Sequence, residues 1–462
     1  MTEPLTMTSS SRTSTGGARM LGTLRDRLNR PFTHPLALAG LALLWSLLGW
    51  LRMTPAARGA IWAEDGRDFL AGAVQHGPLG ALLIPYAGYM HLLPRSIAGI
   101  SSLFPIEWWA QAVTGLACLV AGLVALLVYL VTAQLPIAPW ARLLLASITV
   151  LAPTLVSEVL GNAANMYTFA LWAAFWLFLF RPSKWWSAVI GGVVALMISG
   201  TAIQMAALVP LLAVGWNRRK LPIAAGFLVG LALQAWGFTH SVRQSTPSWP
   251  PLGTINDGYI HQVGLGSWIE SGHAGAVVIV RFGWIGACLA LIPYGLAAWT
   301  LWRAHGDRGT ARVLAVALPA ASYVYWFAFF ALNSLAIDYA NKSPEGLVAG
   351  ASTLRYAVFP SMLLWALLVV AIGWKRKPGE MPRWWGRVRI TVAAVLLVCA
   401  AVNFIGLGTM YRSLGPEWSD SLRQAQTQCA SESPSAPVSV PIAPVGAPWL
   451  ITLTCQAVEA GR

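Results

Sequence analysis

The 32 residues from Trp185 to Trp216, WWSAVIGGVVALMISGTAIQMAALVPLLAVGW, decide how this chain is threaded. They include no charged residue, and as one continuous helix they would extend about 48 Å at about 1.5 Å per residue. A bilayer core is about 30 Å thick and needs about 20 apolar residues to cross. The stretch is therefore too long for one membrane-spanning helix and short for two, and the choice inverts the orientation of everything after it.

The composition of the whole chain indicates a membrane protein. Only 10% of the 462 residues are charged and 56% are hydrophobic, which leaves too little polar surface for a soluble globule of this size. Further apolar runs long enough to cross lie at 35–52, 109–131, 139–157, 164–180, 221–239, 275–302, 312–334, 354–374 and 390–411. Residues 1–34 are rich in Ser and Thr and carry five Arg, so we expect a disordered cytoplasmic tail before an uncleaved signal-anchor helix.

The basic residues resolve the ambiguity of 185–216. If two short spans meet near Ser199-Gly200-Thr201, the chain has eleven helices, and its basic clusters share the side of the N-terminal tail. These clusters are Arg181 with Lys184, NRRK at 217–220, RAHGDR at 303–308 and KRKPGEMPRWWGRVR at 375–389. A single span would place the last three outside, against the preference of Lys and Arg for cytoplasmic loops. Among the 17 acids, the eleven-helix arrangement leaves only Glu3, Asp26, Asp307 and Glu380 on the basic side.

The sequence therefore predicts an all-α, multi-pass protein of the cell membrane, with about 11 transmembrane helices within residues 35–411. The N-terminus is expected in the cytoplasm and the small C-terminal tail, 412–462, outside. The first outer loop, 53–108, is the longest, and its apolar patches separated by Gly and Pro predict short helices on the membrane surface. The net charge of +14 is then a signal of topology, and no nucleic-acid partner is expected.

Two cysteines agree with this orientation. Cys429 and Cys455 lie in the polar tail after the last span, whereas the other three cysteines lie inside spans. On an oxidising outer side the two thiols can form a disulfide, which we expect. In a reducing compartment they would stay free, and this is the alternative.

The first outer loop carries three acids close together, in IWAEDGRDFL at 61–70. Glu64 and Asp65 are adjacent and cannot lie on one helix face, but at a turn closed by Gly66 both can point into a cavity. Such a pair suits a general base, a divalent-metal ligand, or both. The alternative is structural: Asp65 caps the helix that begins here, with Asp68 as its first-turn acid.

Other polar residues are expected on the same outer face as these acids. They are His91, Arg95, Glu158, Asn162, Asn165, Asp257, His261, Arg355 and Tyr356. Arg355 opens the tenth span, where its planar guanidinium can bind a phosphate through two hydrogen bonds. Simpler roles stay open: the two arginines can reach the headgroups from apolar surroundings, His91 can be an interfacial histidine, and the asparagines can cap the fourth helix. Trp62 can stack on a sugar ring, although most of the 24 Trp lie at span ends, as in interfacial belts.

The arrangement as a whole resembles a known class of enzymes. An acidic motif in a long first outer loop, a preceding signal-anchor helix, surface helices and about eleven spans resemble the GT-C class of integral-membrane glycosyltransferases. The resemblance covers the architecture of nearly the whole chain, but its motif is short and is Glu-Asp-Gly instead of the usual Asp-Asp or Asp-Glu. It implies inverting transfer of a sugar from a polyprenyl-phosphate donor to a glycan, lipid or protein acceptor on the outer face, in contact with membrane lipids.

The same resemblance implies roles for individual residues. Asp65, with Glu64 beside it, would act as the catalytic base or hold a divalent metal such as Mg²⁺ or Mn²⁺, the one cofactor that the resemblance leaves open. The donor phosphate would be bound by Arg355, Arg95, Tyr356 and His91. The substrates would be lined by Trp62, Tyr89, Glu158, Asn162, Asn165, Asp257 and His261.

Other functions also fit a polytopic chain. A transporter would carry ionisable residues near the bilayer midplane and internal repeats, whereas nearly all charges here lie at span ends and no repeat is visible. An outer-face polysaccharide polymerase or ligase usually has its large loop late in the chain, an option that the outer loop at 240–274 preserves. A structural or receptor role is the remaining alternative.

Overall fold

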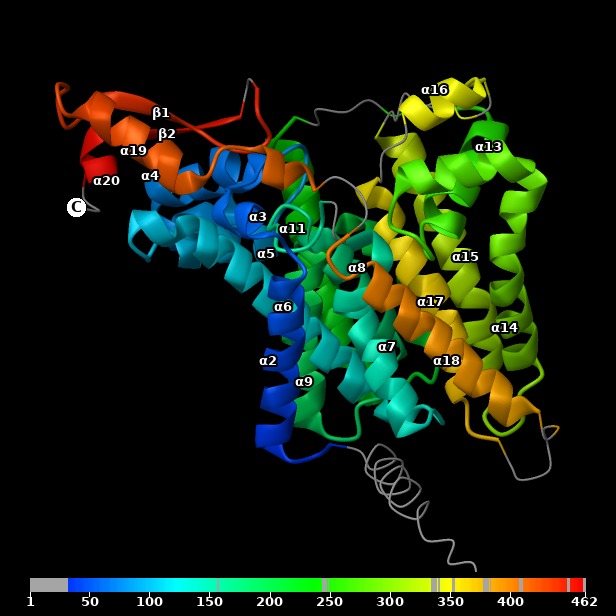
Figure 1. Ribbon diagram of the computed structural model, residues 1–462. Helices are drawn as coiled ribbons and strands as arrows, with labels where there is room; N and C mark the ends of the chain where they lie inside the picture. Colours follow the sequence, from blue (N-terminus) through cyan, green and yellow to red (C-terminus); the bar gives the residue numbers. More distant parts are fainter. Residues whose placement is uncertain are drawn as a thin grey trace, which may run out of the picture.

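The computed structural model describes residues 32–155, 158–242, 247, 249–333, 339, 341–350, 354–376, 382, 384–406, 410–446 and 449–459. The predicted N-terminal tail, 1–34, falls outside this range except for its last three residues. The described chain is helical, with a bundle of apolar helices and a lobe of shorter elements at one end of it (Figure 1).

The bundle contains most of the apolar chain. Its helices are α2 (Pro35–Leu51), α6 (Trp109–Val131), α7 (Pro139–Leu151), α8 (Met166–Leu179), α9 (Trp185–Ser199), α10 (Pro210–Ala213), α11 (Leu221–His240), α13 (Gly272–Cys288), α14 (Ile292–Trp302), α15 (Arg308–Leu332), α17 (Val358–Gly373) and α18 (Trp385–Val402). Short turns around them are η3 (Ile106–Trp108), η4 (Thr132–Gln134), η5 (Pro153–Leu155), η6 (Ile203–Leu208), η7 (Arg218–Lys220), η9 (Leu289–Leu291) and η10 (Arg355–Ala357).

Six of these helical stretches are long and apolar enough to cross a membrane, which indicates a multi-pass membrane protein. They are Ile106–Gln134, Arg218–His240, Gly272–Trp302, Arg308–Leu332, Arg355–Gly373 and Trp385–Val402, each counted with its adjoining turns. Five shorter apolar helices, Pro35–Leu51, Pro139–Leu155, Met166–Leu179, Trp185–Ser199 and Ile203–Ala213, lie where the other predicted spans are. Helix length thus supports six spans, fewer than the eleven predicted.

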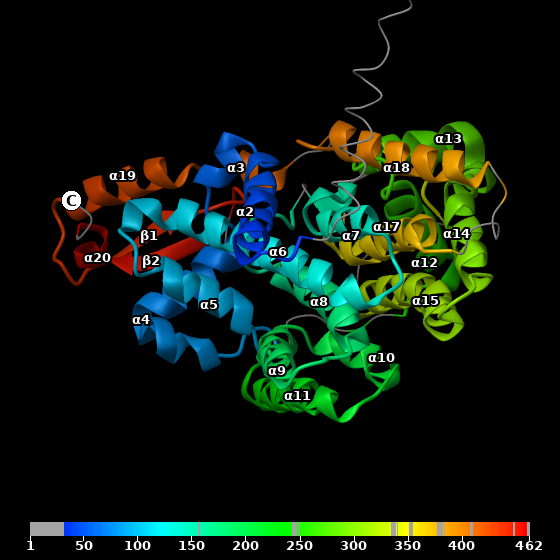
Figure 2. The same cartoon turned by 90° about the horizontal axis from the view of Figure 1, so that it is seen from below.

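The stretch 185–216 folds back on itself. Helix α9 ends at Ser199, where the sequence predicted a break, and η6 and α10 follow. Helices α9 and α11 are parallel neighbours, because Gly192 packs against the start of α11 at Pro222, and Gln234 near its end donates to the carbonyl oxygen of Ser199 at 2.9 Å. Figure 2 shows the two helices side by side. Parallel neighbours require that the chain between them, including η6 and α10, returns to the end where α9 began.

The basic clusters meet at that end of the bundle. The Lys220 Nζ atom donates to the carbonyl oxygens of Phe178, Leu212 and Val214, and so fastens the ends of α8 and α10 to the start of α11. Other contacts at this end join Arg181 to Thr310, Lys375 to Pro136, and Phe32 to Tyr129. Of the acids predicted here, Asp307 caps α15, while Glu3, Asp26 and Glu380 lie outside the described residues.

The lobe at the opposite end joins two distant parts of the chain. From the first outer loop come α3 (Pro55–Gly59), η1 (Asp65–Leu70), α4 (Ala71–Gly80), η2 (Ala81–Leu83) and α5 (Leu92–Ser101). From the C-terminal tail come η11 (Tyr411–Leu414), α19 (Trp418–Cys429), β1 (Pro437–Pro441), β2 (Leu450–Thr454) and α20 (Cys455–Glu459). Blue and red segments therefore lie together at the left of Figure 1. Near the other upper corner lie α12 (Leu252–Gly258), η8 (Tyr259–Leu265) and α16 (Pro344–Ala349).

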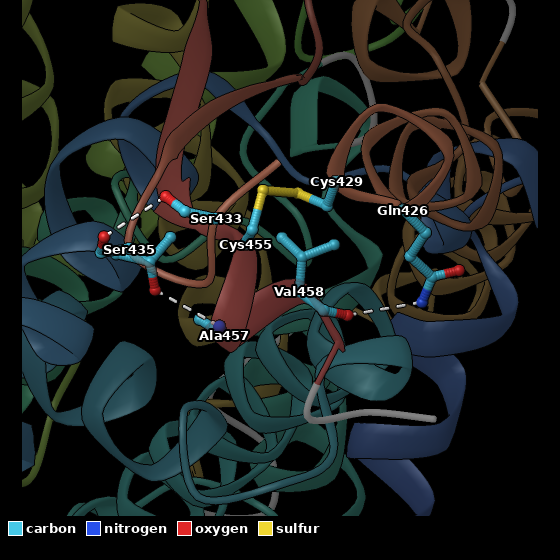
Figure 3. The surroundings of a disulfide bond; sticks show 8 residues. Gln426, Cys429, Ser433, Ser435, Cys455, Ala457 and Val458 are labelled. Atoms are coloured by element: carbon cyan, nitrogen blue, oxygen red, sulfur yellow. Dashed lines mark hydrogen bonds between the residues drawn. A yellow bond between two sulfur atoms is a disulfide. The ribbon is translucent and has the colours of Figure 1, made fainter. Parts of the chain in front are cut away.

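The tail has its own small fold, which the sequence did not predict. Strands β1 and β2 pair antiparallel, and alternate residues of each strand are buried, as a period of two requires. Cys429 and Cys455 form a disulfide between the end of α19 and the start of α20, which is the pairing expected from the sequence (Figure 3). The tail docks on the loop through Trp418, which donates to the carbonyl oxygen of Ile106 at 2.7 Å.

Candidate functional site

A cavity of about 420 Å³ lies at the end of the bundle opposite the basic clusters. Its walls come from the first outer loop, the start of α8, η6, the end of α11, the end of α15 and η10. The lining residues are Glu64, Phe69, Tyr86, Ala87, Gly88, Tyr89, His91, Ala164, Asn165, Tyr167, Ile203, Gln204, Phe238, Phe329, Leu332, Asn333, Arg355 and Tyr356. This mixture of aromatic walls and a few convergent polar groups is typical of a ligand-binding site.

Glu64 and Asp65 point to different sides of their helical turn. Consecutive residues in a helix are turned by about 100° from each other, so adjacent side chains cannot share one face. Glu64 lines the cavity, and its Oε2 atom is buried without a hydrogen-bond partner among the described residues. Asp65 is 1% exposed and does not line the cavity.

Asp65 holds the chain that leads into α8. Its Oδ2 atom accepts from the backbone N–H of Ala163 at 3.0 Å, and its Oδ1 atom from that of Ala164 at 2.7 Å. Burial raises the pKa of Asp65 to about 7, although the nearby Arg412 charge and the two N–H donors lower it. The prediction that Asp65 caps the helix that begins here is wrong, because that helical turn has no side-chain cap and Asp65 instead binds the backbone segment before α8.

Arg355 faces the same cavity as Glu64. One of its guanidinium nitrogens, Nη1, donates to the Oε1 atom of Glu158 at 2.6 Å, and Nη2 donates to the hydroxyl of Tyr356 at 3.4 Å. The Arg355 side chain keeps 29% exposure. The carbonyl oxygen of Glu158 accepts from the side-chain amides of Asn162 and Asn165, both at 3.2 Å, which shapes the loop before α8.

Two of the predicted phosphate ligands have different surroundings. Arg95 is buried outside the cavity, where its Nε donates to the carbonyl oxygen of Ile84 at 2.9 Å and its Nη1 to that of Asp68 at 3.0 Å. Its guanidinium therefore holds the outer loop together. His91 does line the cavity and stacks on Tyr89, with ring centroids 4.1 Å apart. Burial, aided by the charge of Arg95, lowers the pKa of His91 to about 3, so this ring is neutral at ordinary pH.

Of the seven predicted substrate-lining residues, Tyr89 and Asn165 line the cavity, and five do not: Trp62, Glu158, Asn162, Asp257 and His261. Trp62 is buried against Ala443 of the C-terminal tail. Asp257 lies on α12, and His261 on η8 contacts the carbonyl oxygen of Gly272 at 2.8 Å. Trp62, Asp257 and His261 lie elsewhere around the bundle than the cavity, because the charges of the loops predict the end of the bundle at which a residue lies and not its position around the bundle axis.

Sequence reasoning missed four polar residues of the cavity, Tyr86, Tyr167, Gln204 and Asn333. Gln204 is the only amide side chain in the uncharged stretch 185–216, and this isolation was the available signal. Tyr167 is two residues after Asn165. Gln204 and Tyr167 each follow a reversal of the chain direction at the end of the bundle that holds the cavity.

The donor groups do not fit a metal held jointly by Glu64 and Asp65, because both Asp65 oxygens face backbone N–H groups. Within the described ranges, no group of three or more His, Cys, Asp or Glu side chains could hold a metal ion together. No protein-family model, curated protein or solved structure matches this chain. The fold and site together define a multi-pass membrane protein with a polar cavity at one end of its helix bundle.

Proposed function

We propose that this protein is a membrane glycosyltransferase of the GT-C type. It transfers a sugar from a polyprenyl-phosphate donor to a glycan, lipid or protein acceptor on the extracytoplasmic face. The observation that supports this best is one cavity lined by both the Arg355 guanidinium and Glu64, whose Oε2 atom has no hydrogen-bond partner in the described part of the chain. Sugar transfer from a lipid phosphate needs two groups in one site: a base that removes the acceptor proton, and a cation that binds the leaving phosphate.

The proposal includes eleven passes of the chain, with the N-terminus in the cytoplasm. The clustering of basic loops at one end of the bundle supports this orientation, since Lys and Arg prefer cytoplasmic loops. The parallel packing of α9 and α11 supports a double crossing of 185–216. The cavity then opens at the level of the outer leaflet.

The rim of the cavity supports entry of a lipid-linked donor from the side. Phe238 and Ile203 line the cavity and are 66% and 39% exposed, so its edge is apolar where the bundle faces lipid. A guanidinium has five N–H donors, and Glu158 and Tyr356 engage only two of the Arg355 nitrogens. The remaining donors can bind the phosphate of a lipid that enters here.

Glu64, not Asp65, is the base in the proposed reaction, because both Asp65 oxygens already accept hydrogen bonds. Glu64 removes the proton of an acceptor hydroxyl, whose oxygen forms a bond to the anomeric carbon. The bond from that carbon to the phosphate oxygen breaks, and the polyprenyl phosphate leaves with its charge held by Arg355. Attack from the opposite face inverts the anomeric configuration, and no step uses a metal.

The buried charges favour an enzyme over a transporter. Within the described part of the chain, buried charged side chains lie at or beyond the ends of the apolar helices: Arg52, Asp65, Arg95, Arg142, Lys220, Glu270 and Arg412. A transporter would be expected to place such groups near the bilayer midplane.

The test uses purified protein in lipid nanodiscs and a panel of polyprenyl-phosphate hexoses and pentoses. Release of polyprenyl phosphate and formation of glycosylated product are measured by mass spectrometry. We expect the wild type to turn over at least one donor and Glu64→Gln to lose about 10²–10⁴-fold in rate. A Glu64→Gln variant with wild-type turnover, or a wild type inert toward every donor with glycan, lipid and peptide acceptors, would contradict the proposal.

A further inference from the structure

Three polar atoms of the cavity wall make no well-aligned hydrogen bond with another described residue: Glu64 Oε2, Gln204 Oε1 and Tyr167 Oη, although the Thr168 hydroxyl lies near that of Tyr167. Each is buried, and a buried polar atom without a partner costs about 1–3 kcal/mol. Such atoms are uncommon in native structures. Three such atoms in the walls of one cavity indicate a binding site for a ligand that forms hydrogen bonds with them.

The two uncharged groups are held firmly in place. Gln204 is the second residue of η6, and its backbone carbonyl oxygen accepts from the hydroxyl of Tyr325 at 2.8 Å. Tyr167 lies in the first turn of α8, just after the backbone that Asp65 binds, and its ring packs edge-on against Phe329 with centroids 5.8 Å apart. The backbone of Gln204 and the ring of Tyr167 are therefore both anchored to α15 at the wall of the cavity.

The chemistry of these atoms restricts the ligand. An amide oxygen and an ionised carboxylate only accept hydrogen bonds, and a phenol accepts or donates. The ligand is therefore expected to present several donors, and the Arg355 nitrogens that Glu158 and Tyr356 leave unoccupied favour an anionic group on the same ligand. Aromatic rings, among them Phe69 and Tyr86, complete the walls and suit apolar C–H faces. Several hydroxyls, ring C–H faces and one anion are together the properties of a sugar phosphate.

We propose that Gln204 and Tyr167 bind hydroxyl groups of the donor's sugar ring and so select the sugar that is transferred. This inference rests on the proposed glycosyltransferase function and assigns a separate role to each group of residues in the cavity. Arg355 binds the phosphate, Glu64 takes the acceptor proton, and these two residues recognise the sugar. A site that pairs its own polar groups with substrate hydroxyls strongly rejects analogues that lack them, because its buried atoms are then left without partners.

The experiment compares Gln204→Leu and Tyr167→Phe with the wild type. Two quantities are measured: kcat/KM for the preferred polyprenyl-phosphate sugar, and inhibition by undecaprenyl phosphate, which has no sugar. We expect each variant to lose about 5- to 100-fold in kcat/KM, the range for one lost hydrogen bond to a buried group. Inhibition by undecaprenyl phosphate should change less than about twofold, whereas Arg355→Ala should weaken it strongly.

Matched controls separate recognition from folding. Gln111→Leu changes an exposed glutamine at the start of α6, and Tyr323→Phe removes a hydroxyl that bonds Asn256 instead of facing the cavity. Both should behave as the wild type. If Gln204→Leu does not fold, Tyr167→Phe, which removes a single oxygen, decides the question. Donors that lack one ring hydroxyl should lose less in the matching variant than in the wild type.

The outcomes distinguish this inference from the proposed function. If the wild type neither transfers any polyprenyl-linked sugar nor binds undecaprenyl phosphate, the proposed function itself is wrong. If the wild type transfers a sugar and both variants match it, the inference is wrong and the function stands. Equal loss of donor turnover and of undecaprenyl phosphate inhibition would likewise refute a role in sugar recognition.

Discussion

Adjacent carboxylates with different surroundings give a sharp test, because Glu64→Gln and Asp65→Asn make the same chemical change one residue apart. Each replaces a carboxylate oxygen by an isosteric NH₂ group. The Glu64 Oε2 atom has no partner within the described chain, so its replacement removes no hydrogen bond. We expect the unfolding free energy of Glu64→Gln to stay within about 0.5 kcal/mol of the wild type. Its transfer rate should fall about 10²–10⁴-fold.

Asp65→Asn should show the opposite pattern. Both Asp65 oxygens accept backbone N–H groups, at 3.0 and 2.7 Å, so an amide nitrogen must face one of those donors. One hydrogen bond is lost and one buried N–H is left without an acceptor, which costs about 1–3 kcal/mol. The variant should unfold a few degrees below the wild type, while the folded fraction keeps turnover within about tenfold.

The assay pairs thermal unfolding in detergent, followed by size-exclusion chromatography, with donor turnover per folded molecule. Both variants are expressed and purified side by side, so that each is the control of the other. An Asp65→Asn variant with wild-type thermal stability and no turnover, next to an active Glu64→Gln, would identify Asp65 as the base and refute the reasoning. Loss of both stability and turnover in Glu64→Gln would show that its oxygen has a structural partner.

Three further outcomes are expected. The pKa of the Asp65 carboxyl is about 7 in the folded protein, against an ordinary value of 3.8. Between about pH 4 and pH 7 the folded protein therefore holds a proton that the unfolded chain has lost. The unfolding free energy should fall as the pH rises through this range. Asp65→Asn lacks this dependence, so its deficit against the wild type in unfolding temperature should shrink between pH 5 and pH 7.5; a constant deficit would contradict the raised pKa. Arg412 donates to Ala60, Gly161 and Thr114 and lies near Asp65, so Arg412→Met should cost about 3–5 kcal/mol and speed proteolysis of the C-terminal tail, unlike Arg423→Met on the exposed face of α19. Chelation with EDTA should leave transfer unchanged, and restoration of a lost activity by Mg²⁺ or Mn²⁺ would require a metal in the mechanism.

Much of the fold could be predicted from the sequence because membrane insertion imposes simple rules. Apolar length placed the helices of the bundle, and the basic loops predicted that 185–216 reverses direction near Ser199. Helix length was less predictable: α8 has 14 residues, fewer than the roughly 20 that a bilayer core needs, and nearly all of them are buried in the bundle. The docking of the C-terminal tail on the first outer loop depends on contacts between residues more than 300 positions apart, such as Trp418 with Ile106, which no local pattern reveals.

For the candidate site, the sequence predicted at which end of the bundle the residues lie, but not which side chains point into the cavity. Charge predicted Glu64, His91 and Arg355 at one end of the bundle, and these three residues line the same cavity there. Arg95 lies at the same end of the bundle, but its guanidinium donates hydrogen bonds to the backbone carbonyl oxygens of Ile84 and Asp68 in the first outer loop. Gln204 was missed because a single amide in an apolar segment does not by itself indicate a binding site. Its position at the cavity follows from the reversal of the chain after α9, which the fold reveals.

The two adjacent carboxylates of IWAEDGRDFL have different surroundings: Asp65 binds backbone N–H groups, and Glu64 faces the cavity, where we propose that it acts as the base. Asp65 fastens the backbone of Ala163 and Ala164, and that backbone continues directly into Tyr167. The segment just before it carries Glu158, the ion-pair partner of Arg355. A structural carboxylate thus connects the loop that bears the proposed base to the loop that orients the proposed phosphate ligand. Since adjacent residues on a helical turn must diverge, anchoring Asp65 on one side also turns Glu64 into the cavity, and the structural role is what makes the chemical role possible.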